Sequence, residues 1–280
     1  MNDDADRAAR RLGAAANLAH GFVYFAPEAV QAFAALGLGD DQQYFAGRAA
    51  PMGAVPASVV EAIFFNFAPH RVRAAIPSAW TVAEPATVQQ ARFDAIAAVF
   101  ERSGGVGLDA AELTELATLS ERLVDGAGTA GRPLAAANRE VAPPEDAAVQ
   151  AWQWATICRE WRGDAHVAVL VATPVTPLEA LVLHAATGKV PVAALRDTRG
   201  WTDDQWSATV EELRTRGLTT ADGAFTEEGR VFRSAIERGT DTACRAMVDA
   251  LGPTDTDRLI ELFDRMGQHL RAAGLYDAYL

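Results

Sequence analysis

Several polar side chains stand inside one of the most apolar segments of this chain. Residues 44–80 are rich in aromatic and aliphatic side chains, yet Arg48, Glu61, Asn66 and His70 lie among them. A buried polar group without a hydrogen-bond partner costs roughly 1–3 kcal/mol, and an unpaired buried charge costs more. These side chains must therefore pair with one another or bind a ligand, which makes the segment a candidate binding site.

The two charged residues of this segment allow two interpretations. Residues 57–67 are apolar on every side of a helix, which predicts a helix buried all round with Glu61 as its only charge. Arg48 belongs to a preceding helix that must pack nearby. We expect either a buried structural pair between Arg48 and Glu61, or a contact from one of them to a ligand's carboxylate, phosphate or amine.

Aromatic residues surround the amide of this segment. Asn66 stands between Phe65 and Phe67, and a buried amide needs up to four hydrogen bonds. It either caps the backbone broken at Pro69 or orients a ligand in an aromatic pocket, to which Tyr44 would add a hydroxyl. The predicted ligand-binding residues are Tyr44, Arg48, Asn66, Phe67, His70, Trp80 and His166.

The five histidines lack the spacing of a metal site. None are three or four residues apart, and neither HExxH nor CxxCH occurs. His20, His166 and His184 have apolar neighbours, where a histidine is either a satisfied core residue or a ligand or base. We predict no metal ligands, and a haem or metal site would have to be assembled from distant elements. For an enzyme, the candidate acid–base residues are His20, Glu61 and His184.

Composition limits the class of protein. The chain has 280 residues, enough for two domains, half of them hydrophobic, and a net charge of −12. Such a chain does not attract nucleic acid as a whole, because DNA binding rests on basic patches. Cys158 and Cys244 lack metal-ligand spacing, which favours buried reduced thiols in a cytoplasmic protein. We expect no signal peptide and no transmembrane helix, since no apolar run approaches about 18 residues.

Helical patterns fill the chain and predict an all-α protein. We expect an N-terminal helical domain over residues 1–142 that builds an apolar pocket, and a second domain over residues 143–280. In the second domain, a long helix over 145–161 should end at a turn, Arg162-Gly163-Asp164. The residues that follow, 166–172, form a short strand or a buried helical turn.

The C-terminal part has the order of elements of a winged helix-turn-helix. Helices are predicted over residues 177–187, 190–198 and 203–216. Asp222-Gly223 between two short extended runs predicts a hairpin, and a helix over 227–251 follows it. Residues 195–229 contain RGL, Asp-Gly and Thr-Glu-x-Gly in this order, and the segment resembles the winged-helix core of MarR-type bacterial regulators. The resemblance implies a small two-stranded wing after three helices.

The charges of this segment fit DNA poorly. Readers of this class place the N-terminal part of the recognition helix in the major groove, and here that part is Asp203-Asp204. The wing carries Asp222, whereas each phosphate contact needs a positive donor. Nucleic-acid binding is therefore predicted to be unfavourable. In a homodimer it would rely on the arginines near the acidic helix, which are Arg196, Arg199, Arg214 and Arg216.

The resemblance extends beyond this module. Several segments of the chain are similar to segments of a family of actinobacterial helix-turn-helix proteins. These segments are YFAGRAAPMGAV, FFNFAP, LVLHAATG and RGWTDDQW, and the resemblance covers the chain from about His20 to the C-terminus. It implies a bacterial origin and a helix-turn-helix fold, and it names no reaction.

Three functions follow from these features. The leading hypothesis is a small-molecule-binding protein on a MarR-like scaffold, acting as a sensor or accessory protein, for example in actinobacterial secondary metabolism. The first alternative is an enzyme that uses the same apolar pocket with His or Glu as acid and base. The second is a DNA-binding transcriptional regulator.

Overall fold

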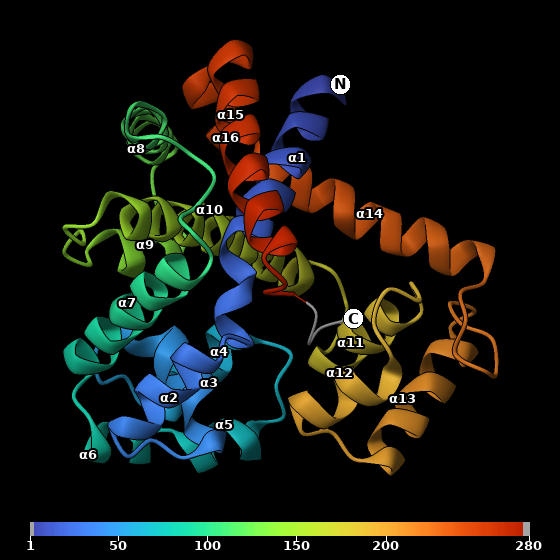
Figure 1. Cartoon of the computed structure of the whole chain (residues 1–280). Helices are drawn as coiled ribbons and strands as arrows, with labels where there is room; N and C mark the ends of the chain where they lie inside the picture. Colours follow the sequence, from blue (N-terminus) through green and yellow to red (C-terminus); the bar gives the residue numbers. More distant parts are fainter. Residues whose placement is uncertain (1–2, 277–280) are drawn as a thin grey trace.

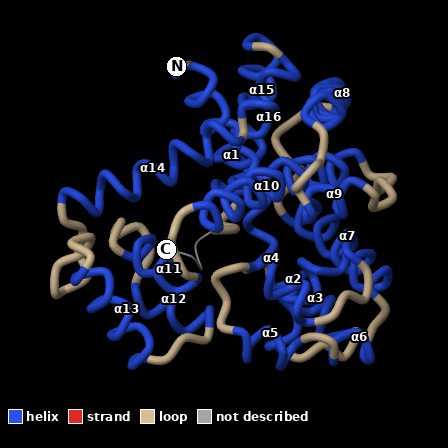
Figure 2. The backbone as a smooth tube through the Cα atoms, turned by 180° about the vertical axis from the view of Figure 1, so that it is seen from behind, coloured by secondary structure: helices blue, strands red, loops and turns tan. Residues whose placement is uncertain are grey.

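The computed structural model describes residues 3–276 as an almost wholly helical protein. Figure 2 shows helices joined by loops, and this described part contains no β-strand beyond one isolated bridge. The predominantly helical class predicted from the sequence is therefore confirmed.

One long helix runs through the middle of the molecule (Figure 1). This helix, α10 (Ala147–Ala172), begins at Asp146, whose carboxylate accepts hydrogen bonds from Ala148 N and Val149 N. Its apolar residues point in all directions, which a helix can sustain only when other elements surround it. The remaining helices therefore pack around α10 in two groups.

The larger hydrophobic core joins the N-terminal helices to the end of the chain. In this core α1 (Asp3–His20) lies against both α10 and α16 (Pro253–Ala272). The other helices of this core are α2 (Pro27–Ala35), α3 (Asp40–Ala49), α4 (Ala57–Phe64), α5 (Pro69–Ala75), α6 (Ser78–Val82), α7 (Pro85–Arg102), α8 (Ala110–Ala127), α9 (Pro133–Arg139) and α15 (Arg245–Leu251), with two 3-10 turns, Gly21–Tyr24 and Ala50–Met52.

A smaller core belongs to the helix-turn-helix segment. It is formed by α11 (Pro177–Ala185), α12 (Val192–Arg199), α13 (Asp203–Thr215) and the first half of α14 (Glu227–Ala243). The turn between α12 and α13 has Gly200 in the left-handed conformation, followed by Thr202, which caps α13. Leu170 of α10 also packs in this core, so α10 contributes to both.

The helix α10 is longer than the sequence predicted. Arg162, Gly163 and Asp164 are helical, so the expected turn is wrong. Of the two alternatives for residues 166–172, the strand is wrong and the helical one holds, since these residues continue α10. Asp164 is held inside the fold because its Oδ2 accepts hydrogen bonds from Leu134 N (2.9 Å) and Ala135 N (3.0 Å) at the start of α9. A polar triplet that looks like a turn is thus kept helical by tertiary contacts.

Three other expected elements differ from the prediction. The predicted two-stranded wing is not formed. Residues 218–226 contain one isolated antiparallel bridge, between Thr219 and Phe225, because this segment leads at once into the end of α13 and the cap of α14. The apolar helix over 57–67 ends at Phe64 as α4, and only Val60 and Phe64 of it are buried. The prediction of a helix buried all round was therefore wrong. The helix expected over 227–251 is divided at Cys244 into α14 and α15.

Both cysteines are buried and free, as the sequence predicted. Burial raises the pKa of Cys158 to about 12, so this thiol stays protonated. Among residues 3–276, no single helix combines the length and apolarity needed to cross a membrane. The helices α10 and α11 reach the required length and apolarity only when they are counted together, and the chain bends by 110° between them.

Gly229 lets α14 begin directly against the turn that precedes it. A Cβ at this position would lie 1.9 Å from the carbonyl oxygen of Leu218. Thr226 caps the same helix, since its hydroxyl oxygen accepts a hydrogen bond from Gly229 N (3.0 Å) and donates one to Gly217 O (2.6 Å). The Thr-Glu-x-Gly sequence thus has a structural reason.

We predict that Gly229→Ala lowers the free energy of unfolding by about 1–3 kcal/mol, because the backbone of the turn must move to admit the methyl group. Thermal unfolding measures the change. Gly163→Ala is the control, since a Cβ there meets nothing closer than Glu160 Oε2 at 3.5 Å. Equal melting temperatures for the two variants would contradict the prediction.

Candidate functional site

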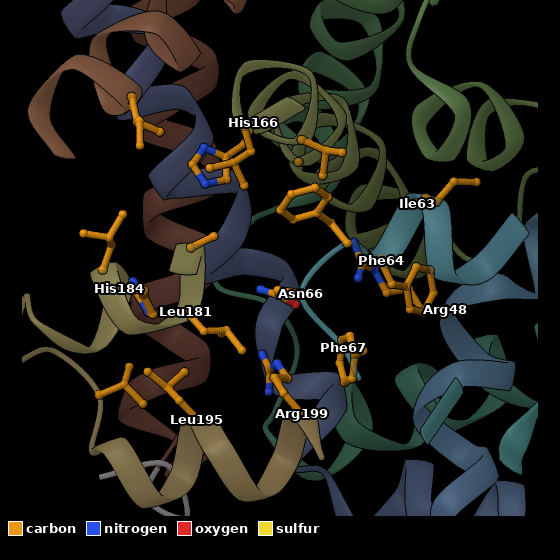
Figure 3. A pocket seen from close by; sticks show the side chains of 18 of the residues that line it. Arg48, Ile63, Phe64, Asn66, Phe67, His166, Leu181, His184, Leu195 and Arg199 are labelled. Carbon is orange, nitrogen blue, oxygen red and sulfur yellow. The ribbon is translucent and has the colours of Figure 1, made fainter. Parts of the chain in front are cut away.

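A cavity of about 350 Å³ lies between the two cores (Figure 3). The larger core contributes Tyr44 and Arg48 of α3, and the segment that follows α4. The helix-turn-helix segment contributes Leu181 and His184 of α11 and Leu195 and Arg199 of α12, and α10 contributes His166. Residues of the larger core and of the helix-turn-helix segment would therefore both contact a molecule bound in this cavity.

A buried ion pair forms the wall of the cavity next to α10. Arg48 Nε and Nη2 each donate to an oxygen of Glu160 at 2.9 Å, and these side chains are 12% and 1% exposed. Arg159 binds the same carboxylate. Burial alone would raise the pKa of Glu160, but Arg159 and Arg48 together hold it well below its usual range.

The pairs formed here correct an expectation from the sequence. Arg48 does not contact Glu61, because it reaches Glu160 on α10. Glu61 instead pairs at the surface with Arg73, whose Nε lies 2.6 Å from Glu61 Oε1. The predicted Arg48–Glu61 pair was therefore wrong, and Glu61 lies outside the cavity, where acid–base chemistry in the pocket would not reach it.

Positive charge exceeds negative charge around this wall. Arg48, Arg159 and the buried Arg92 act electrostatically on one another, and Glu160 is the one carboxylate among the main charges that act on Arg92. Three guanidiniums against one carboxylate leave a local excess of two positive charges, inside a chain whose net charge is −12. The interior around Arg48 therefore favours an anion.

A chain of hydrogen bonds leads from α10 towards the tyrosines of the site. Thr156 Oγ1 donates to Trp152 O (2.9 Å), so it accepts from His20 Nδ1 (2.8 Å). His20 is neutral because burial holds its pKa well below its ordinary value, and its Nε2 accepts from the Tyr24 hydroxyl at 3.1 Å. Both ring nitrogens of His20 are thus occupied.

Tyr44 lies where the arginines meet. Arg48 Nη1 donates to its hydroxyl at 3.4 Å, and its ring packs on Phe67. Burial tends to raise the pKa of Tyr44, but the guanidiniums of Arg48, Arg199 and Arg159 act against it and leave that pKa below its usual value. This hydroxyl gives up a proton more readily than an ordinary tyrosine.

Two histidines face the cavity from the α10 and α11 side. His166 Nδ1 donates to Thr240 Oγ1 (2.9 Å), because that hydroxyl itself donates to Ile236 O (2.9 Å). Burial lowers the pKa of His166 to about 4, and it also lowers the pKa of His184. Both rings are neutral, so the Nε2 of His166 is an acceptor.

Most of the predicted binding residues come together, and a few do not. Those that line the cavity are Tyr44, Arg48, Asn66, Phe67 and His166, and the candidate acid–base residue His184 lines it as well. His70 is exposed, and Trp80 donates its Nε1 proton to Val55 O (3.1 Å), so neither lines the cavity. The Asn66 amide caps no backbone at Pro69 and has no hydrogen-bond partner within residues 3–276, and Figure 3 shows it inside the cavity.

Sequence reasoning missed the charged partners of Arg48. Glu160 and Arg159 stand in α10, where the supposed turn at residues 162–164 made them look like a helix end. Arg92 stands in α7, which looked like an ordinary amphipathic helix. The signal that could have identified Glu160 was its place between the mostly apolar residues 154–158 and Trp161 in a helix that is apolar on most sides. In the described part of the chain, no three His, Cys, Asp or Glu side chains are grouped to hold a metal ion.

The chain belongs to the helix-turn-helix family, because the model of that family matches residues 9–277. The match covers nearly the whole chain and so includes both cores. No curated protein and no solved structure matched.

We predict that Glu160→Gln destabilises the fold by about 3–5 kcal/mol, because it leaves Arg48 and Arg159 buried without a carboxylate. Chemical denaturation measures the loss. Glu61→Gln is the matched control, and it should change stability little because its ion pair is at the surface. Similar effects of the two substitutions would show that the buried pair does not organise the core.

The neutral histidines predict a loss of stability on acidification. The unfolded chain binds a proton at His166 near its ordinary pKa of 6.5, whereas the folded protein does so only near pH 4. The contribution of neutral His166 to the free energy of unfolding is therefore fully present above about pH 6.5, and it is lost as the pH drops towards 4. Melting temperatures between pH 7 and pH 4.5 measure the fall in stability. His166→Gln should make this fall smaller but not abolish it, because burial also lowers the pKa values of His20 and His184. The exposed His70→Gln is the control, and an unchanged slope in His166→Gln would contradict the prediction.

Proposed function

We propose that this helix-turn-helix protein binds a small molecule in the cavity between its two cores and acts as a sensor. The single observation that carries the proposal is the shared wall of the cavity. Asn66 and Phe67 approach from one core, and Leu195 and Arg199 approach from the helix-turn-helix segment. A bound molecule would therefore affect the position of α12 and of α13 after it. A MarR-like sensor, as the resemblance of residues 195–229 implies, is the finer form of this proposal.

Backbone contacts at the cavity support this coupling. Ala68 N donates to Arg199 O at 2.9 Å, and Trp201 Nε1 donates to Asn66 O at 3.0 Å. The segment after α4 is thus tied to the turn between α12 and α13. A ligand that moves Asn66 would move the same turn.

Strain in the backbone also favours a functional site here. Phe65 has φ 44° and ψ −60°, in a region that non-glycine residues rarely adopt, and its ring packs with the smaller core. Such a conformation costs on the order of 1–3 kcal/mol and persists at sites where the fold serves function. The strained residue precedes Asn66, the unpaired amide in the cavity.

The test is the release of a small molecule from the purified protein. Native mass spectrometry of the intact protein, followed by denaturation, should show a bound molecule. Ala180→Trp, which fills the cavity from α11, should abolish it. The control Ala193→Trp places the same ring on the exposed surface of α12. A molecule retained by Ala180→Trp, or none found and none bound from a metabolite library, would refute the proposal.

DNA binding is the second candidate, and family membership favours it. The charges of α13 oppose it, because three of the four arginines expected to contact DNA already bind a carboxylate, and the fourth, Arg199, lines the cavity. Arg214 binds Glu211, Arg196 binds Asp197 and Asp203, and Arg216 binds Glu179. A specific gel shift at physiological salt, weakened by Arg214→Ala, would establish this function. The absence of any complex at low salt would exclude it for the chain as purified.

A further inference from the structure

A second cavity, also of about 350 Å³, lies on the other side of Tyr44 and Arg48. Its apolar lining includes Val23, Ala29 and Phe33. Val30 also lines it and is 45% exposed, so it stands at the rim. The helix-turn-helix segment does not line this cavity, and the sensor proposal does not involve it.

The unusual member of this lining is Arg92 of α7. Its side chain is 2% exposed, and within residues 3–276 it makes no hydrogen bond and no ion pair. Its Nη2 is fully buried without a partner. Its guanidinium carbon lies 4.7 Å from the centre of the Trp152 ring, a cation–π contact that uses none of its five N–H donors.

A charge in this state is costly for the fold. Burial lowers the pKa of Arg92, which shows that the surroundings do not compensate the guanidinium. Glu160 is the carboxylate that acts on it, and Arg48 and Arg159 already occupy that group. Buried charges in folded proteins are normally paired, so an unpaired one beside a cavity indicates a missing anionic partner.

We propose that this second cavity binds an apolar organic acid, whose carboxylate pairs with Arg92 and whose hydrocarbon body lies against Val23, Ala29 and Phe33. A planar guanidinium binds a carboxylate through two parallel hydrogen bonds. The apolar part of the lining suits a hydrocarbon body better than a polyphosphate or a sugar, and the one acidic residue of the lining, Asp40, is exposed. Gly47 shapes the cavity, because a Cβ there would lie 2.8 Å from Phe33 Cζ.

Isothermal titration calorimetry with octanoate, octanol and octylamine tests the charge requirement. The wild-type protein should bind octanoate at least about tenfold more tightly than octanol, and octylamine should not bind, because only the carboxylate forms charge-assisted hydrogen bonds with Arg92. Equal affinities for octanoate and octanol, or no octanoate binding at millimolar concentration, would overturn the proposal.

Two variants locate the binding site. Arg92→Met should weaken octanoate binding at least about tenfold, while Arg102→Met, the same change at an exposed position of α7, should leave it unchanged. Arg92→Met should also raise the melting temperature, since it removes an unpaired buried charge. Val30→Trp should block the rim while it retains Arg92, so it tests the site even if Arg92→Met fails to fold.

The outcomes separate this site from the sensor cavity. Octanoate binding that is lost in Arg92→Met and Val30→Trp but kept in Ala180→Trp supports the proposal. Binding that is lost in Ala180→Trp but unchanged in Val30→Trp and Arg92→Met overturns it and places the acid between the cores, where the sensor proposal would still stand.

Discussion

The ion pair between Arg48 and Glu160 is the constraint on which the arrangement of this protein depends. It joins α3 to the central helix α10 at the point where the two cavities meet. A buried pair of this kind contributes little net stability over apolar packing, but it permits few alternative arrangements once formed. The position of α3, and with it Tyr44, is therefore fixed relative to α10.

The same pair explains why the interior around it is positive. Glu160 can neutralise one charge, yet Arg48, Arg159 and Arg92 all lie within its influence. Although the protein as a whole is acidic, these three arginines repel one another, and the local excess of positive charge attracts anions from the solvent. The nearby guanidiniums lower the pKa of Tyr44 against the effect of its burial, and they add to the burial that keeps His20 neutral. One electrostatic feature thus governs several side chains.

The helix-turn-helix segment is joined to this interior by few but specific contacts. Its own core is separate, and α10 and α14 connect it to the larger core. The hydrogen bonds from Ala68 to Arg199 and from Trp201 to Asn66 cross the cavity region between them. The helix-turn-helix segment is thus held by the long helices α10 and α14 and by these two hydrogen bonds. A ligand that alters the two hydrogen bonds can shift the segment as a rigid body. The acidic residues of α13, Asp203 and Asp204 at its start, are the feature of this segment that opposes direct contact with DNA.

The sequence by itself determined the helical class and the helix-turn-helix segment, and it singled out Tyr44, Arg48 and Asn66 as polar groups in apolar surroundings, because periodicity, capping residues and polarity are local signals. Only the tertiary structure decided that Arg48 pairs with Glu160 and not with Glu61. It also decided that α10 continues through residues 162–164 and that Arg92 is buried with no hydrogen bond or ion pair in the described part of the chain. The physical reason is that a charge is satisfied by whichever group lies nearest in space. For Arg48 that group is 112 residues away in the sequence, and no local pattern identifies it.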